Sequence, residues 1–251
     1  MTDDATQPDT ADQTDTTAPR RVLGVFAHPD DAEFFAGGTF ARWAAEGAEI
    51  TLVLATSGDK GSPELEMTSE TLAKIREEES VNAAHKLGVK DVVFLRYKDG
   101  ELFPTLDLRR DVTRQIRLKK PDVVVTLDPH RYWYGSRGIN HPDHRAIGAA
   151  TLEAVFPTAR DRLNFIELER DEGLAPHKAL TVYVAGVETP TVTVDVTAHI
   201  QTQVNALIEH KSQIKTPDEL YDRIYTRSLD PDAPPEAPRN IERFHMIQLR
   251  G

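Results

Sequence analysis

The chain has 251 residues, of which 39% are hydrophobic and 28% charged, and its formal net charge is −11. This length and composition are typical of one α/β domain with a full core, or at most two small ones, and the negative charge argues against nucleic acid as a partner. The absence of cysteine excludes disulfides, thiolate metal ligands and a cysteine nucleophile. No apolar run is long enough to span a membrane and the start lacks the layout of a signal peptide, so we expect a cytoplasmic protein without membrane contact.

The first 20 residues differ in composition from the rest. They are rich in Asp, Thr, Gln and Ala and hold no large apolar residue after Met1. Such a segment cannot bury a core, so we expect residues 1–20 to be a disordered acidic tail. We find no further boundary, and residues 21–251 are predicted to form a single domain.

From residue 21 onwards, strand and helix patterns alternate. The apolar runs predict strands at residues 22–27, 50–56, 91–95, 123–127, 180–185 and 191–195. The helical patterns predict helices at residues 33–46, 69–87, 106–119, 143–159 and 198–214. Residues 231–238 are rich in proline and predict a surface loop. Such alternation indicates an α/β fold with a mostly parallel sheet, and in the common doubly wound order the first and fourth strands are neighbours.

A polar turn, His28-Pro29-Asp30-Asp31, follows the first predicted strand. Ligands of open α/β sheets bind at the carboxyl ends of strands, so an imidazole and two carboxylates here fit a metal site with a base beside it. The alternative is structural, with Asp30 or Asp31 as the N-cap of the following helix. Taken alone, this turn does not separate the two hypotheses.

The tripeptide His-Pro-Asp that opens this turn occurs a second time, in His141-Pro142-Asp143-His144, again after a predicted strand. The topology predicts that the two motifs face one crevice although they are far apart in sequence. A catalytic zinc typically takes three protein ligands and keeps a position for water. His28, Asp31 and His144 would supply two nitrogens and one oxygen.

This ligand set leaves other ionisable groups beside the metal. Asp30 is placed to act as a general base on a water whose pKa zinc lowers. A cationic His141 would stabilise the oxyanion formed when that water attacks a carbonyl. Asp143 would orient or charge a neighbouring histidine. Together these groups predict metal-dependent hydrolysis.

The two motifs together resemble those of the LmbE/PIG-L zinc-dependent N-deacetylases. The resemblance runs from about Arg21 to the helix predicted to end near Ile214. It includes Thr56-Ser57-Gly58 after the second strand, Arg76 with Glu79 on the second helix, and Asp99-Gly100 after the third strand.

The resemblance implies a Rossmann-like three-layer sandwich with a metal site at the carboxyl ends of strands 1 and 4. It implies hydrolysis of an amide, usually the N-acetyl group of an amino-sugar conjugate, with Zn2+ as cofactor. Fe2+ is not distinguished from Zn2+ at such a site. The implied roles are metal ligands His28, Asp31 and His144, general base Asp30, oxyanion-stabilising acid His141, and substrate contacts Arg76 and Asp99.

Several alternatives stay open at this point. A Rossmann-type nucleotide-binding module is one, although the chain lacks Gly-x-Gly-x-x-Gly after its first strand. An amidase for a larger sugar-thiol conjugate is another, but Ile139 stands where some such members carry a tyrosine, unless Tyr132 or Tyr134 substitutes. A homologue without activity is disfavoured by the presence of both Asp30 and His141. The oligomeric state is also open, a homo-oligomer included.

The remaining polar residues are given structural interpretations. Arg76 with Glu77, Glu78 and Glu79 is most simply a solvated helix face, in contrast to the role that the resemblance implies for Arg76. The histidines outside the two motifs are expected to be surface or packed residues, with His130, after the fourth strand, the best candidate among them for lining the pocket. The aromatic residues of the long loop 128–140 either stack on a sugar or anchor the loop.

Overall fold

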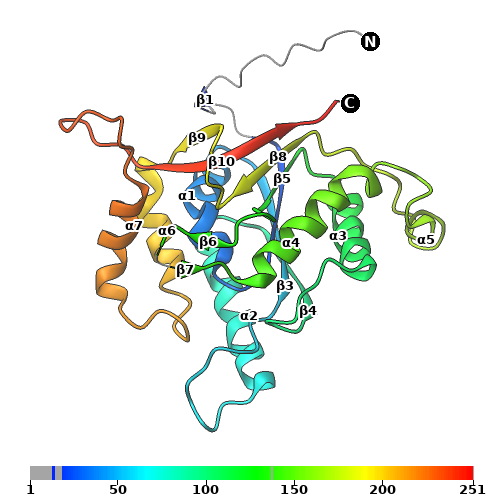
Figure 1. Cartoon of the computed structure of the whole chain (residues 1–251), viewed down its shortest axis with the longest axis horizontal. Helices are drawn as coiled ribbons and strands as arrows, with labels where there is room; N and C mark the ends of the chain where they lie inside the picture. The colour runs from blue at the N-terminus through cyan, green and yellow to red at the C-terminus, as the bar shows by residue number, and fades with distance from the viewer. Residues whose placement is uncertain (1–12, 15–18, 137, 251) are drawn as a thin grey trace.

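The computed structural model of the chain describes residues 13–14, 19–136 and 138–250 (Figure 1). The strands are β1 (Gln13–Thr14), β2 (Arg21–Phe26), β3 (Glu49–Thr56), β4 (Asp91–Tyr97), β5 (Val123–Leu127), β6 (Trp133–Tyr134), β7 (Gly138–Ile139), β8 (Thr181–Ala185), β9 (Val192–Asp195) and β10 (Ile241–Gln248). The helices are α1 (Asp31–Ala45), α2 (Ser69–Lys86), α3 (Leu106–Lys119), α4 (Pro142–Glu153), α5 (Ile166–Arg170), α6 (Ile200–Leu207) and α7 (Leu220–Ser228). Short helical turns are η1 (Ala154–Thr158), η2 (Thr197–His199) and η3 (Pro217–Glu219).

The main sheet has the strand order β1-β9-β10-β8-β5-β2-β3-β4. β2 pairs in parallel with both β3 and β5, and β5 pairs in parallel with β8. The first and fourth strands of the predicted alternation are therefore neighbours, in the register Val22 to Val123. The predicted α/β class with a mostly parallel sheet is confirmed.

Helices cover both faces of this sheet and give three layers. α6 packs against both α1 and α2 on one face, and α3 and α4 pack together on the other (Figure 1). Burial on both sides explains the composition of the central strands, since all five residues of β5 are buried and three of them are valine. The core lies between the sheet and these two helical layers.

Gly148 allows α4 to approach the end of β5 closely. A Cβ atom at this position would lie 2.2 Å from the carbonyl oxygen of Leu127, far inside van der Waals contact. The helix therefore begins next to the carboxyl end of β5, which brings the second motif to the edge of the sheet where β2 also ends. This packing positions His141-Pro142-Asp143-His144.

Two predicted helices are shorter than expected. The helix predicted at residues 143–159 ends at Glu153 and continues as η1, and that predicted at residues 198–214 ends at Leu207. Beyond Leu207 the backbone turns so that Ser212 donates from its N–H and hydroxyl to the Glu79 carboxylate, at 2.8 and 2.7 Å. A bond between distant segments therefore shapes this turn, which carries neither proline nor glycine.

Two elements near the C-terminus were not predicted. α7 follows η3, and β10 follows the loop at residues 231–238. β10 pairs antiparallel with both β8 and β9, in register Phe244 with Ala185 and Ile241 with Asp195. It is thus an interior strand, although only part of it is buried.

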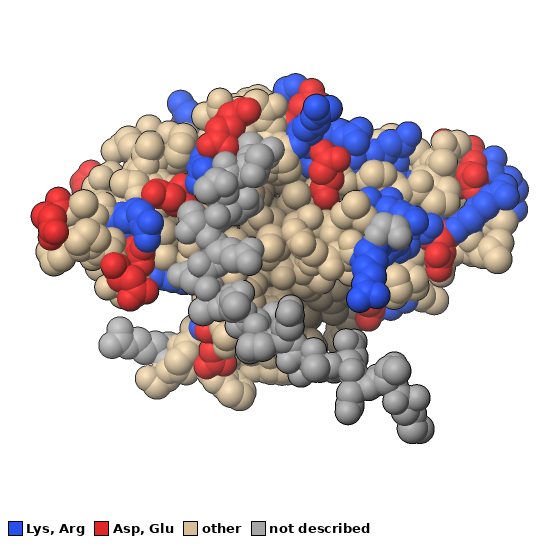
Figure 2. All heavy atoms as spheres, turned by 90° about the horizontal axis from the view of Figure 1, so that it is seen from above, with Lys and Arg blue, Asp and Glu red and all other residues tan. Residues whose placement is uncertain are grey.

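The predicted tail, residues 1–20, lies mostly outside the described residues, and the division into tail and domain stays a prediction. Within it, Gln13–Thr14 pair in parallel with β9. No helix in the described ranges has both the length and the apolar character needed to cross a membrane. On the face shown in Figure 2, basic and acidic side chains are interspersed.

Candidate active site

The turn after β2 has an unusual backbone. Asp30 precedes α1 with φ 90° and ψ −23°, and its side chain makes no capping hydrogen bond. This left-handed conformation is uncommon for a residue with a Cβ, and such strain costs about 1–3 kcal/mol. Asp31 Oδ2 accepts a hydrogen bond from the His28 N–H at 2.9 Å, which lies outside the helix. Asp30 therefore occupies the N-cap position of α1, as one of the two hypotheses had it, but its carboxylate does not cap the helix.

Three side chains of the two motifs converge at the ends of β2 and β5. The Nδ1 atom of His28 lies 3.3 Å from Asp31 Oδ2, and the Nε2 atom of His144 lies 3.0 Å from Asp31 Oδ1. One ligand atom from each of the three lies within 4.8 Å of the others. Two imidazole nitrogens and one carboxylate fit the donor set of a catalytic zinc or ferrous site.

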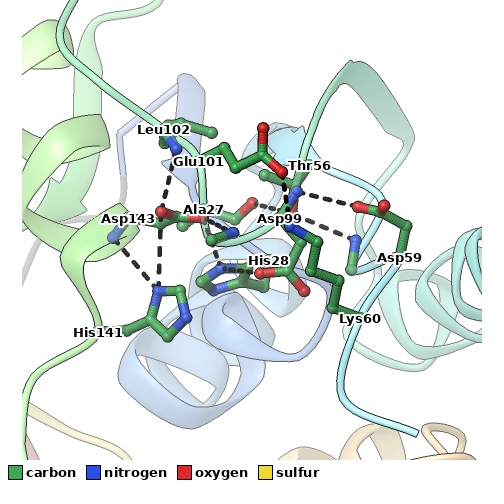
Figure 3. Close-up of polar contacts among 12 residues, drawn as sticks. Ala27, His28, Thr56, Asp59, Lys60, Asp99, Glu101, Leu102, His141 and Asp143 are labelled. Carbon is green, nitrogen blue, oxygen red and sulfur yellow. Dashed lines mark hydrogen bonds and ion pairs between the residues drawn. The ribbon is translucent and has the colours of Figure 1, made fainter. Parts of the chain in front are cut away.

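The other nitrogen of His28 is directed at a pair of carboxylates. Its Nε2 atom lies 3.2 Å from both Asp143 Oδ2 and Asp99 Oδ1. Asp143, fully buried, also accepts hydrogen bonds from the backbone N–H of Gly100 at 2.7 Å and Leu102 at 3.2 Å (Figure 3). With Nε2 held in this way, the Nδ1 atom faces Asp31.

His144 is oriented by Asn140, which the sequence analysis did not single out. Asn140 Oδ1 lies 2.8 Å from His144 Nδ1 and also accepts a hydrogen bond from the Tyr134 hydroxyl at 3.0 Å. The Asn140 amide nitrogen donates to the carbonyl oxygen of Arg131. An Nδ1–H that donates to Asn140 leaves the His144 Nε2 lone pair available to an ion beside the Asp31 carboxylate. In the sequence, the feature that could have indicated this role is the position of Asn140 directly before the second motif.

Asp30 lies beside this cluster and contacts Arg76. Arg76 Nη2 is 3.6 Å from Asp30 Oδ2, and the guanidinium donates to the carbonyl oxygens of Gly58 and Pro29, both at 3.0 Å. Burial, followed by the charge of Asp31, raises the pKa of Asp30 to about 7, against the opposing effect of Arg76.

Arg76 is only 5% exposed, so the prediction that it belongs to a solvated face is wrong, and the same holds for buried Glu79. The reason is the close approach of Gly58, where φ is +61° and a Cβ atom would lie 2.4 Å from Arg76 Nη1. Only glycine leaves room for the guanidinium at this point of the loop after β3. Arg76 thus ties that loop to the turn after β2.

His141 is the N-cap residue of α4 and is more exposed than the other residues of the two motifs that form the site. Its Nδ1 atom accepts a hydrogen bond from the Asp143 N–H at 3.2 Å, and its ring centroid is 4.5 Å from that of His28. Burial and the neighbouring His28 lower the pKa of His141, which favours the neutral imidazole rather than the cation expected from sequence. A neutral ring with Nδ1 accepting carries its hydrogen on Nε2.

The electrostatic environment of the cluster favours positive charge. Burial acts to lower the pKa of His28, but Asp31, Asp143 and Asp99 outweigh it and raise that pKa well above its usual range. Burial acts to raise the pKa of Asp31, but His144 and His28 outweigh this effect and hold that pKa well below its usual range. A cluster with this excess of carboxylate groups is suited to bind a divalent cation.

An open pocket of about 410 Å³ leads to these groups. Lys60 and Gly61 in its lining belong to the Gly-rich loop after β3, and Gln213, which follows α6, was not predicted from the sequence. The pocket is lined by His28, Asp30, Asp31, Lys60, Gly61, Arg76, Asp99, Gly100, His141, His144 and Gln213.

Comparison with known families agrees with this geometry. The family model of PIG-L, GlcNAc-PI de-N-acetylase, matches residues 23–155, which is more than half of the chain and includes both motifs. The chain belongs to the PIG-L family.

Relatives of this PIG-L family member are deacetylases by name. Diacetylchitobiose deacetylase of Thermococcus kodakarensis is 31% identical over 202 residues, covering 80% of this chain and 72% of that protein. 1D-myo-inositol 2-acetamido-2-deoxy-alpha-D-glucopyranoside deacetylase of Actinosynnema mirum is 31% identical over 238 residues, covering 79% and 82%. The solved structure of N,N'-diacetylchitobiose deacetylase from Pyrococcus horikoshii is similar with a TM-score of 0.78 and 28% identity, covering 92% of this chain and 84% of that one.

The histidines outside the two motifs lie apart from the three converging donors in this PIG-L family member. His177 Nε2 lies 2.7 Å from the carbonyl oxygen of Pro121, and His210 is fully buried with Nε2 3.5 Å from Glu33 Oε2. His130 is exposed and lines a different cavity from the active-site pocket. These positions agree with the structural interpretation given to them.

The aromatic loop contributes one polar contact to the site. Tyr132 and Trp133 are 56% and 64% exposed, whereas Tyr134 is half-buried and bonds to Asn140. Tyr134 therefore anchors the loop. A sugar contact by Tyr132 or Trp133 stays a prediction.

Proposed function

We propose that this protein is a metal-dependent N-deacetylase that hydrolyses the N-acetyl group of a small amino-sugar conjugate. The observation that carries the proposal is the convergence of His28, Asp31 and His144 with Asp30 left beside them. Membership of a family whose relatives act on N-acetylated amino sugars supports the substrate class.

His28 Nδ1, one oxygen of Asp31 and His144 Nε2 would hold the ion, which we propose to be Zn2+, with Fe2+ as the alternative. When bound, such an ion lowers the pKa of a water molecule and polarises the acyl oxygen. Asp143 and Asn140 hold the other nitrogen of each imidazole, which would leave His28 Nδ1 and His144 Nε2 available to the ion.

Asp30 would take the proton of the attacking water as general base. A base is most effective when its pKa is near the working pH, and burial places Asp30 in that range. Arg76 holds the Asp30 carboxylate in place and limits the rise of its pKa.

His141 would donate from Nε2 to the oxygen on which negative charge develops. Asp30 would then pass the proton taken from water to the amine nitrogen as the C–N bond breaks. Water and the amide thereby become acetate and the free amine. Loss of one such donor typically costs about 10²-fold or more in rate. Arg76 and Asp99 line the pocket and are proposed to contact the sugar.

The test measures metal content and acetate release for the same preparations. N,N'-diacetylchitobiose and 1D-myo-inositol 2-acetamido-2-deoxy-alpha-D-glucopyranoside serve as substrates. We expect His144→Ala to lose both metal and activity, and Asp30→Asn to keep the metal while losing about 10²-fold or more in rate. His85→Ala, an exposed histidine on α2, is the matched control and should behave like the wild type.

Retention of one equivalent of metal and of full activity in His144→Ala would contradict the ligand assignment. Full activity in Asp30→Asn with metal bound would contradict the assignment of the base. A cytoplasmic location and a homo-oligomeric state stay predictions, to be checked by cell fractionation and light scattering.

A further inference from the structure

A second cavity, of about 420 Å³, is lined in part by Phe35, whose ring lies beside that of His144. It lies between the start of α1, the loop after β5, the loop after β8, α7 and β10, and it shares no lining residue with the active-site pocket. Its lining residues are Phe34, Phe35, Arg131, Tyr134, Gly186, Val187, Gln203, Ile224, Arg227, Ser228, Ile241, Glu242 and Arg243.

Three arginines from three different elements line this cavity: Arg131, Arg227 and Arg243. Within the described parts of the chain, their hydrogen bonds go to backbone carbonyl oxygens, and none of them forms an ion pair with a carboxylate. The acceptors are the carbonyls of Trp133, Gly186 and Val187 for Arg131, of Phe34 for Arg227, and of Leu229 for Arg243. Carbonyl oxygens fix the guanidinium groups without neutralising their charge.

Among the described lining residues Glu242 is the one carboxylate, and its oxygens bind groups outside the cavity lining as well as Gln203. Its oxygens accept hydrogen bonds from the N–H groups of Gly38 at 2.9 Å and Thr39 at 2.8 Å, and from Gln203 Nε2 at 3.1 Å. Even as a full negative charge, Glu242 offsets only one of the three arginines. The cavity therefore carries an excess of positive charge.

The arginines also keep unused donors. A guanidinium has five N–H donors in a planar fork, and Arg227 and Arg243 each use one in the hydrogen bonds described above. Such forks bind the paired oxygens of phosphates and carboxylates. We infer that this cavity is an anion-binding site for a small phosphate- or carboxylate-bearing molecule, separate from the candidate metal centre.

The anion site shares a wall with the active site. The Phe35 ring centroid is 5.7 Å from that of His144, and Tyr134 reaches His144 through Asn140. An anion held by Arg131, Arg227 and Arg243 therefore lies behind the side chains that orient His144. Its site is distinct from the substrate pocket that the proposed function uses.

Isothermal titration calorimetry on the full chain tests this inference, with sodium phosphate in one arm and sodium acetate in the other. Ionic strength is held constant with sodium chloride, and a chelator is present so that no metal ion at His28, Asp31 and His144 binds the anion. The variants are Arg227→Gln and Arg243→Gln. Arg223→Gln is the matched control, because Arg223 lies on α7 and over the Phe34 ring but does not line the cavity.

We expect saturable binding of one of the two anions by the wild type, and the arm that binds tighter identifies the class of ligand. Binding should weaken about tenfold or more in Arg227→Gln and in Arg243→Gln and stay unchanged in Arg223→Gln. Circular dichroism checks folding, and because the two arginines lie on different elements, either variant alone carries the test. The inference is overturned by an absence of saturable binding in both arms, or by wild-type affinity in a folded Arg227→Gln or Arg243→Gln protein.

Discussion

Each candidate histidine ligand is oriented by a residue that is not itself a ligand. Asp143 holds His28, and Asn140 holds His144 by a contact of 2.8 Å to Nδ1. Partners of this kind set which nitrogen is protonated and the direction in which the ring points, so they influence metal affinity without touching the ion. Asn140 is buried, and no water would readily replace its amide oxygen.

We therefore predict that Asn140→Ala weakens metal binding about 10- to 100-fold while the protein stays folded. Competition with a chromophoric chelator measures this affinity. Tyr134→Phe is the control, because it removes the hydroxyl that also contacts Asn140 Oδ1 and leaves the bond to His144. Equal affinities for Asn140→Ala and the wild type would show that His144 does not depend on Asn140.

At the scale of elements, the site depends on how closely α4 approaches β5. Gly148 is the point of contact, since a Cβ atom there would lie 2.2 Å from the Leu127 carbonyl oxygen. Backbone atoms on both sides cannot move aside as a flexible side chain would. The strained turn at Asp30 places the first motif, and this contact places the second.

Gly148→Ala is expected to destabilise the protein even though alanine favours helices over glycine by about 1 kcal/mol. Overpacking typically costs about 1–3 kcal/mol, and the displaced start of α4 should also weaken metal binding. Urea denaturation measures the first effect and chelator competition the second. The reverse change one residue later, Ala149→Gly, should lose about 1 kcal/mol of stability and leave metal affinity unchanged. A stabilised Gly148→Ala protein would contradict the close contact.

At the scale of the whole molecule, the sheet is completed by its last strand. β10 inserts between β8 and β9, and the preceding loop is closed by Asp230 and Arg239. Arg239 Nε donates to Asp230 Oδ2 at 3.0 Å, and the Asp232 N–H donates to Asp230 Oδ1 at 3.1 Å. The ion pair with Arg239, together with the Asp232 N–H, lowers the pKa of Asp230 in the folded protein.

This lowered pKa predicts a pH-dependent contribution to stability. A carboxylate with a lower pKa in the folded than in the unfolded state, about 3.9 for Asp, stabilises the fold fully above the unfolded value. That stabilisation is lost as the pH falls through the folded pKa. Asp230→Asn should therefore be less stable than the wild type at pH 7, and the difference should shrink toward acid pH. Urea midpoints across this range measure it, and a difference independent of pH would contradict the argument.

The alternation of strands and helices, the class of the fold and the pairing of the first and fourth strands followed from the sequence alone. They depend on local periodicity and on general rules of strand order, both of which a single chain displays. The same rules predicted that the two His-Pro-Asp motifs meet, and the contact of His144 with Asp31 agrees with that prediction.

Only the tertiary structure decided what depends on contacts between distant segments. The burial of Arg76 follows from its fit against Gly58, the bond of Asn140 to His144 follows from the start of α4, and the place of β10 follows from its two partners. The arginine-lined cavity is of the same kind, because its charges come from three elements that are adjacent only in space. Local sequence patterns do not predict such contacts, since side chains far apart in sequence become neighbours only when the chain folds.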